Sequence, residues 1–278
     1  MTAAAVTGAR CGRGDFRLEV SDGIARVTIA TPDGLNGYTR ANLAPFAALV
    51  REAAAAPADF VLLTGEGANF CIGASAGLLT EMREMPRPSL ERFIRDGQEV
   101  IRAVVDCDRI VVAQVNGFAA GGGMDLLLAC DMAYADRGAR LNLFYSRLGV
   151  LPDHGGLFFL DERLGSGAGR REYLANRRYG AEEAVAARLI DGLSPEDVSN
   201  AGWHRHLSRA LPVPLSVMVA LKRLRRAERG EALEEHLTAM AGLQADLLGG
   251  ADQRARIDRV AAMQAAGLNA PAAAAGAR

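Results

Sequence analysis

The sequence predicts an α/β protein with a largely parallel sheet and a helical C-terminal region. Between Phe16 and Leu193, short apolar runs alternate with segments of helical spacing. Such alternation is typical of parallel strands joined by right-handed helical crossovers. A glycine triplet at residues 121–123 lies where one apolar run turns into a helical face, and after Leu193 only helical spacing continues.

The composition favours a soluble globular protein with a large core. The 278 residues are 50% hydrophobic and 23% charged, and the net charge is −1. This balance gives no argument for nucleic acid or an anionic membrane as a partner, and no apolar stretch is long enough to span a bilayer. The four cysteines form neither a CxxC pair nor a Cys/His pattern. We therefore expect no metal site and a reducing, cytoplasmic setting.

The elements of the N-terminal half are expected in a regular order. Phe16–Val20 and Ile24–Ile29 alternate in polarity around the turn Ser21–Gly23, which predicts a β-hairpin. A helix is expected at about Arg40–Ala55, and Phe60–Thr64 is an apolar run that predicts a buried strand.

A second group of elements follows. Leu90–Val105 has helical spacing and leads into a buried strand at Ile110–Val115, and Asp131–Ala135 predicts another short strand. A helix is expected to begin at Ser194-Pro195-Glu196, because proline is favoured at the first helical position.

The C-terminal region should then contain two separate helices, Pro214–Glu228 and Glu231–Leu248. We expect a core at residues 15–200 that holds the active site and a helical region at 201–263 that serves oligomerisation. The Ala-rich ends, residues 1–14 and 264–278, are expected to be loose.

The segment Asn116–Asp125, which holds the glycine triplet, is the most informative part of the chain. Glycine lets the backbone adopt unusual dihedral angles and lets a ligand approach closely. The first amides of the following helix are unsatisfied and favour negative charge, so this corner can bind a phosphate or a developing oxyanion. The spacing fits neither a dinucleotide fingerprint nor a P-loop. Simple helix–strand packing is the structural alternative.

A second segment, Thr64–Ser75, has the sequence TGEGANFCIGAS. Together with Asn116–Leu126 it resembles, in order and separation, the two motifs of the crotonase family, also called the enoyl-CoA hydratase/isomerase family. The resemblance extends from about Phe16 to about Met263. It implies a spiral core of β-β-α repeats with a helical C-terminal region, assembled as a homotrimer or a homohexamer.

The resemblance also implies an oxyanion hole. Two backbone amides of the family bind a thioester carbonyl oxygen, and by motif position they are those of Ala74 and Gly122. Removing one such donor typically costs about 3 kcal/mol of transition-state stabilisation. The implied partner is an acyl-CoA or acyl-carrier thioester, with CoA as part of the substrate and no separate cofactor. The expected pocket residues are Ile72, Ser75, Phe118, Phe144 and His154, and for Ser75 a helix N-cap is the favoured alternative.

Family hydratases use two glutamates, and both positions differ here. The first is Asp125, and the second, four residues before Gly149, is Tyr145, whose phenol is a poor base at neutral pH. Asp153, four residues after Gly149, matches a position that the family's dienoyl-CoA isomerases and aryl-CoA dehalogenases use. Asp153, Asp125 and Tyr145 are therefore the expected catalytic residues. Asp153 could also be a plain helix N-cap, and Asp125 could simply satisfy the first turn of its helix.

Three functions stay open at this point. The leading one is enolate stabilisation for double-bond isomerisation or an atypical hydration or dehydration, since one carboxylate can move a proton between carbons. In the second, Asp153 attacks the substrate as a nucleophile, which gives hydrolysis, dehalogenation or C–C cleavage. The third is a non-catalytic scaffold that only binds a thioester.

Overall fold

The computed structural model describes residues 9–265 of the chain. Within this range a seven-stranded sheet has the order β1-β2-β3-β4-β6-β8-β11, and a four-stranded sheet has the order β10-β9-β7-β5. The strands of the large sheet are β1 (Ala9–Arg13), β2 (Phe16–Ser21), β3 (Ile24–Ile29), β4 (Phe60–Gly65), β6 (Ile110–Val115), β8 (Met132–Ala135) and β11 (Gly192–Leu193). The strands of the small sheet are β5 (Asn69–Cys71), β7 (Phe118–Ala120), β9 (Arg140–Asn142) and β10 (Arg178–Gly180).

Strands β4 and β6 form the centre of the large sheet, and every residue of both is buried. Burial on both faces explains why these segments are uninterrupted apolar runs in the sequence. From β3 to β11 all neighbours pair in parallel, and the predicted β2–β3 hairpin is confirmed as antiparallel.

The prediction that residues 1–14 are loose was wrong for part of that segment. Residues 9–13 form strand β1, which pairs antiparallel with β2. A ladder consists of backbone hydrogen bonds, so this segment pairs without the apolar alternation that would have predicted a strand. Residues 1–8 lie outside the described range.

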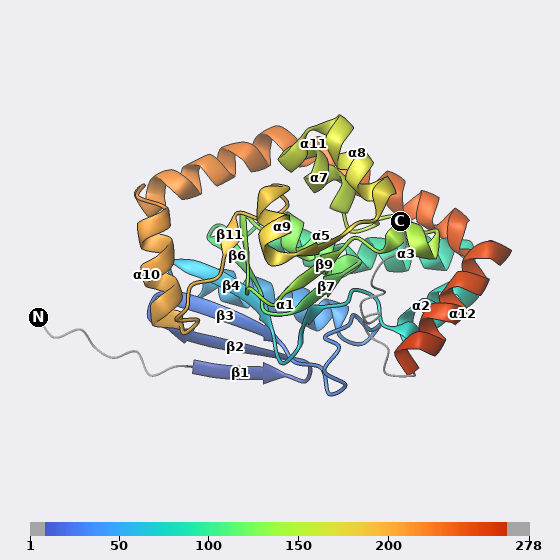
Figure 1. Ribbon diagram of the computed structural model, residues 1–278, viewed down its shortest axis with the longest axis horizontal. Helices are drawn as coiled ribbons and strands as arrows, with labels where there is room; N and C mark the ends of the chain where they lie inside the picture. Colours follow the sequence, from blue (N-terminus) through green and yellow to red (C-terminus); the bar gives the residue numbers. More distant parts are fainter. Residues whose placement is uncertain (1–8, 266–278) are drawn as a thin grey trace, which may run out of the picture.

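The helices surround the sheets and extend along one side of the molecule (Figure 1). They are α1 (Leu43–Ala55), α2 (Ala76–Glu84), α3 (Arg87–Gly97), α4 (Glu99–Val105), α5 (Gly122–Ala129), α6 (Tyr145–Leu148), α7 (Gly156–Leu164), α8 (Ser166–Ala175), α9 (Ala181–Ala186), α10 (Asn200–Ala210), α11 (Leu215–Leu248) and α12 (Ala251–Ala265). Among the described residues, no helix combines the length and the apolar composition needed to cross a membrane.

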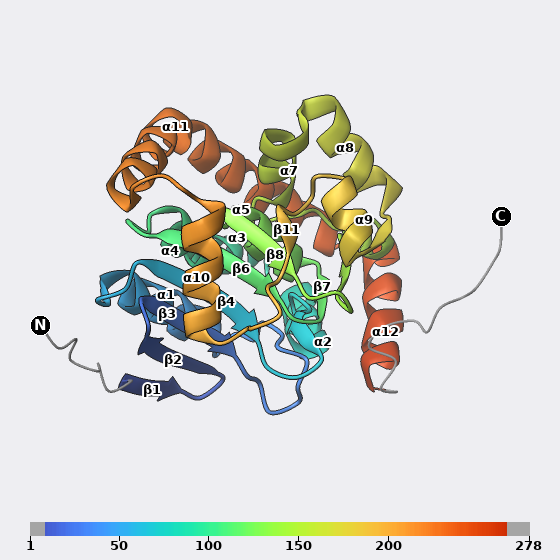
Figure 2. The same cartoon turned by 60° about the vertical axis from the view of Figure 1, so that its left-hand side comes forward.

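The two faces of the large sheet pack against different hydrophobic clusters. On β4, Phe60 and Leu62 pack in a cluster with Trp203 of α10, whereas Val61 and Leu63 belong to the main core. Helix α10 therefore covers one face of the sheet, as Figure 2 shows, and α1 and α4 contribute to the main core. This alternation is what the period of two in a strand requires.

The C-terminal helices differ from the prediction in two respects. Residues 194–199 are not helical, and α10 begins at Asn200 rather than at Pro195, because Ser199 is the N-cap and accepts a hydrogen bond from Gly202 N–H. The two expected helices are one continuous helix, α11. Gly230 does not end it, because a helix interior tolerates an isolated glycine at a cost of about 1 kcal/mol.

Helices α11 and α12 fold back over the core, where α11 packs on α3 and α12 packs on α2 (Figure 1). Helix α12 continues to Ala265, slightly beyond the expected start of the tail, and residues 266–278 lie outside the described range. The C-terminal region therefore covers the part of the core where the small sheet ends.

The small sheet positions the predicted site. Strands β5, β7 and β9 are parallel neighbours, so their carboxyl ends lie at the same edge. The segments that follow them begin at Ile72, Gly121 and Leu143. These segments contain both predicted oxyanion amides and Tyr145, although they are far apart in the sequence.

Candidate active site

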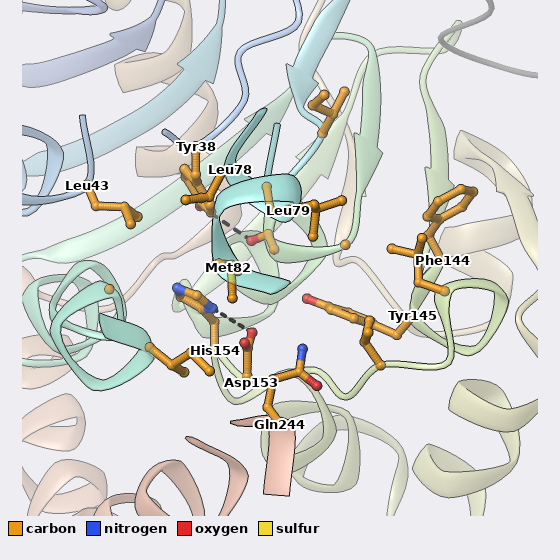
Figure 3. A pocket seen from close by; sticks show the side chains of 18 of the residues that line it. Tyr38, Leu43, Leu78, Leu79, Met82, Phe144, Tyr145, Asp153, His154 and Gln244 are labelled. Carbon is orange, nitrogen blue, oxygen red and sulfur yellow. Dashed lines mark hydrogen bonds and ion pairs between the residues drawn. The ribbon is translucent and has the colours of Figure 1, made fainter. Parts of the chain in front are cut away.

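A cavity of about 80 Å³ lies beyond this edge of the small sheet. One side is lined by apolar side chains of α1, α2 and α3, namely Leu43, Leu78, Leu79, Met82, Phe93 and Ile94. The opposite side is more polar, with Asp153 and His154 from the loop before α7, Tyr145 from α6 and Gln244 from α11 (Figure 3). The cavity is therefore asymmetric, with an apolar wall facing a group of polar side chains.

The two predicted oxyanion segments line this cavity through Ala74, Gly121 and Gly122. Each amide follows a glycine with positive φ, +76° at Gly73 and +51° at Gly121. This region is costly for other residues. Tyr38 holds the first segment, because its N–H donates to Gly73 O (2.7 Å) and its carbonyl accepts from Ser75 N–H (2.9 Å).

The two segments lie so close together that only glycine fits. A Cβ atom at Gly73 would lie 2.4 Å from Gly122 N, and one at Gly123 would lie 2.0 Å from Cys71 O. Among the hydrogen bonds of the described residues, neither Ala74 N–H nor Gly122 N–H has an acceptor. Two amides from neighbouring loops, both at the cavity surface, can bind one oxygen that develops negative charge.

Asp153 is the carboxylate among the residues that line the cavity. It is 6% exposed, and its Oδ1 lies 2.9 Å from His154 Nδ1. Its backbone carbonyl accepts a hydrogen bond from Gln98 Nε2 (2.7 Å), and the same nitrogen donates to Leu237 O of α11 (2.8 Å). Gln98 thus ties the Asp153 loop to the C-terminal helix. No hydrogen bond within the described chain uses Asp153 Oδ2.

The His154 imidazole supports this carboxylate. Burial lowers the pKa of His154, but the adjacent Asp153 outweighs that effect and the net pKa is raised. The ring is stacked on Tyr38 with centroids 6.0 Å apart, and its Nε2 faces Gly97, where a Cβ atom would lie 3.3 Å away. His154 is therefore held on both sides and fixes one oxygen of Asp153.

Asp125 lies behind the cavity rather than in its lining. It is fully buried, and Oδ2 accepts a hydrogen bond from His154 N–H (3.2 Å). Oδ1 has no partner among the described residues and lies against the start of α7, where a Cβ atom at Gly156 would be 2.0 Å away. Burial raises the pKa of Asp125 to about 7; Tyr145 and His154 oppose this effect and the Asp153 carboxylate adds to it. Asp125 is well placed to support the 153–156 loop.

Asp125, Asp153 and His154 bring ligand-capable atoms within 4.8 Å of one another. These are the described side chains that could hold a metal ion. The hydrogen bonds among them already account for their closeness, because His154 donates to Asp125 through its backbone and pairs with Asp153 through its ring.

Tyr145 reaches the cavity from the segment after β9. The preceding Phe144 has φ +65°, and its N–H donates to Asn176 Oδ1 (2.9 Å), which stabilises this unusual turn. The Tyr145 hydroxyl is buried and has no partner among the described residues. Burial, with Asp125 and Asp153 nearby, raises the pKa of Tyr145 well above its usual value. The group is therefore a neutral phenol that can donate a hydrogen bond and cannot act as a base at neutral pH.

The remaining predicted pocket residues divide into two groups. Ile72 and Phe144 line the cavity, as expected. Ser75 lies beside it and caps α2, since its Oγ accepts from Leu78 N–H (3.1 Å). The structure places Phe118 at the start of β7, outside the cavity lining.

The sequence did not point to two residues of this site, Gln98 and Gln244. Gln98 is the residue that precedes α4, and Gln244 lies on α11. No local sequence motif marks either residue. Only the packing of the C-terminal helix on the core brings them to the Asp153 loop.

Residues 19–261 match the sequence profile of the enoyl-CoA hydratase/isomerase family. The chain belongs to this family. Among its relatives is a probable enoyl-CoA hydratase of Rhodobacter capsulatus, which is 30% identical over 246 residues, or 86% of this chain and 91% of the relative. The recognition from two glycine-containing motifs is confirmed.

Solved structures support the same fold. An enoyl-CoA hydratase from Bacillus halodurans matches with a TM-score of 0.79 at 20% identity, over 88% of this chain and 100% of that one. An enoyl-CoA hydratase from Mycobacterium avium subsp. paratuberculosis matches with a TM-score of 0.74 at 27% identity, over 89% and 95% of the two chains. The protein thus has the crotonase fold, with its largely parallel sheets and helical C-terminal region.

Proposed function

We propose that this enzyme moves a double bond within an acyl thioester, most simply an acyl-CoA, with Asp153 as the group that transfers the proton. The observation behind this proposal is that Asp153 is the carboxylate among the cavity-lining residues, while Asp125 lies behind it. The amides of Ala74 and Gly122 would bind the thioester oxygen. One carboxylate can serve two substrate carbons in turn, whereas adding water normally needs a second group to activate the water.

The reaction of a 3-enoyl thioester would proceed in two steps. Asp153 Oδ2 takes a proton from C2, and the C–H electron pair forms a dienolate whose oxygen is stabilised by the two amides. The same carboxyl then returns the proton to C4, which leaves a 2-enoyl thioester. His154 keeps Oδ1 occupied, so Oδ2 is the oxygen available for this transfer.

The test compares Asp153→Asn with Asp125→Asn in assays of 3-enoyl-CoA isomerisation and of 2-enoyl-CoA hydration. Asp153→Asn should lower isomerase turnover by at least ~100-fold, the usual size of a general-base contribution. Asp125→Asn should lower it by less than about 10-fold, because Asp125 acts through the loop. Equal losses in both variants, or hydration faster than isomerisation in the unmodified enzyme, would contradict the proposal.

An isotope experiment separates proton transfer from nucleophilic attack. In a single turnover in H₂¹⁸O, a nucleophilic Asp153 would transfer unlabelled oxygen from its own carboxylate to the product. Proton transfer instead predicts no oxygen exchange. In D₂O, C4 of the product should carry the hydrogen taken from C2, or deuterium to the extent that the carboxyl exchanges its proton with solvent before the return. Appearance of protein-derived oxygen in the product would replace the isomerase assignment with hydrolytic chemistry.

A further inference from the structure

Gln244 presents a hydrogen-bond donor to the cavity. It lies on α11, is 3% exposed, and its Oε1 accepts from Leu151 N–H at 2.9 Å. Because this bond fixes the oxygen end of the amide, the nitrogen end points the other way. Figure 3 shows that nitrogen directed toward the space between Asp153 and Tyr145. Among the described residues no acceptor pairs with Gln244 Nε2.

A second donor points into the same space. The Tyr145 hydroxyl is buried, lines the cavity and has no partner within the described chain. Its raised pKa keeps it protonated, so it donates. Figure 3 shows the tips of Asp153, Tyr145 and Gln244 converging on one region of the cavity. Two donors and the free Oδ2 of Asp153 therefore meet there.

These groups do not suit a plain hydrocarbon chain. The opposite wall, formed by α1, α2 and α3, already supplies an apolar surface. A buried donor that meets only CH₂ groups loses its hydrogen bond to water and gains nothing. A site built to hydrogen-bond a substrate group rejects the analogue that lacks that group, because its own polar atoms are then left unpaired.

We propose that Gln244 is a specificity-determining residue that, together with Tyr145, donates hydrogen bonds to an oxygen atom on the acyl group of the substrate. The substrate class is then an acyl thioester with a hydroxyl or carbonyl oxygen close to the reacting carbons. This oxygen is distinct from the thioester oxygen, for which Ala74 and Gly122 supply the donors. The proposal rests on the proposed thioester function and adds the class of acyl group to it.

The test measures binding by calorimetry, so that turnover does not complicate the result. The probes are hexanoyl-CoA, 5-oxohexanoyl-CoA and 5-hydroxyhexanoyl-CoA, which have the same chain length and carry the added oxygen on the carbon next to C4. The unmodified enzyme should bind one or both oxygenated probes at least ~10-fold more tightly than hexanoyl-CoA, a factor that corresponds to one net hydrogen bond. The 5-oxo probe can only accept at this position, whereas the 5-hydroxy probe can also donate to Asp153.

Three variants locate the preference. Gln244→Met and Tyr145→Phe should each reduce it by about 5-fold or more, with hexanoyl-CoA affinity unchanged within about 2-fold. Gln244→Glu retains an acceptor for Leu151 N–H and replaces the donor by a buried carboxylate, so it should lose the preference. Its thermal midpoint should fall, because the new charge is buried near Asp153. The control is Gln253→Met on α12, whose amide donates to Gly149 O (3.4 Å) outside the cavity lining.

The outcomes are distinguishable. If the unmodified enzyme binds hexanoyl-CoA without preferring the oxygenated probes, or if the variants weaken all probes equally, the Gln244 proposal is wrong and the thioester function stands. If none of the three thioesters binds, the proposed function itself fails. Loss of preference in both Gln244 variants and in Tyr145→Phe, but not in Gln253→Met, would support the proposal.

Discussion

The two sides of the cavity are built in different ways. The side that would bind the thioester oxygen consists of backbone amides, placed by Gly73 and Gly121 in loops that follow neighbouring parallel strands. The side that would carry out the chemistry consists of side chains from the Asp153 loop, α6 and α11. Backbone donors survive every substitution at their own position except proline, whereas each side chain can change independently. The first side therefore preserves the family's motifs, and the second differs from the family's two-glutamate pattern.

The largest expected effect tests whether the two loops that carry the backbone amides need glycine at position 73. Gly73→Ala places a Cβ atom 2.4 Å from Gly122 N, so the two loops must separate. Losing one oxyanion donor costs about 3 kcal/mol, so turnover should fall by at least ~100-fold. The control is Gly67→Ala, where φ is +73° and nothing lies within 4 Å of the added Cβ. It should show only the strain of the left-handed conformation, about 1–2 kcal/mol of stability. Comparable activity losses in both variants would contradict this role for Gly73.

The second prediction concerns the side of the cavity built from side chains, where the ionisation of buried Asp125 costs folding stability. Burial raises the pKa of Asp125 to about 7, so the folded state disfavours its charge. That cost is absent below the carboxyl's ordinary pKa of about 4. It grows as pH rises and is complete above about 7, so stability falls across this window. His154 acts in the same direction, because its stabilising contribution is lost as pH rises through its raised pKa.

Asp125→Asn should therefore flatten this pH dependence and stabilise the protein at pH 8 relative to pH 5, by an amount up to about 2.5 kcal/mol. Urea unfolding at the two pH values measures it. Asp108→Asn is a control of opposite sign, because Arg223 lowers the pKa of Asp108 and its contribution is lost as pH falls. An unchanged pH slope in Asp125→Asn would show that Asp125 is not the group responsible.

The third prediction asks whether His154 positions Asp153. His154→Phe keeps a ring against Tyr38 but removes the partner of Asp153 Oδ1. We expect about a 10-fold loss of kcat and a shifted acidic limb of the pH–rate profile, with KM nearly unchanged. His204→Phe is the matched control, since His204 forms a similar 2.9 Å pair with Asp59 at the surface. If kcat and the profile are the same in both variants, His154 has only a packing role.

The smallest expected effect concerns Ser75, where the structure confirms the favoured N-cap role, at the start of α2. Ser75→Ala should cost about 1 kcal/mol of stability, with kcat within about 2-fold of the unmodified enzyme. Ser199→Ala, at the N-cap of the distant α10, should cost a similar amount. Thermal unfolding and turnover of both variants check this. A loss of kcat found in Ser75→Ala alone would return Ser75 to a substrate-binding role.

Local patterns were sufficient for much of the fold and for half of the site. The hairpin, the buried strands and the two glycine loops follow from alternation, apolar runs and residues whose special backbone angles only glycine adopts easily. Two predicted helix boundaries were wrong because another local preference was stronger. Helix α10 starts after Ser199 and not at Pro195, and Gly230 does not interrupt α11. Strand β1 was missed because pairing there depends on an exposed edge of β2 and not on its own apolar pattern.

The sequence by itself determined the family, the glycine loops that carry the two predicted oxyanion amides and the replacement of both expected glutamates. It could do so because backbone conformation is encoded locally, by glycines at fixed spacing. Only the tertiary structure decided that Asp153 lines the cavity with Asp125 behind it, and that Gln98 and Gln244 reach the same loop from other elements. Those relations join residues up to 93 positions apart, as between Leu151 and Gln244. Burial and hydrogen-bond partners at such separations depend on how the C-terminal helices pack on the core, which no local pattern specifies.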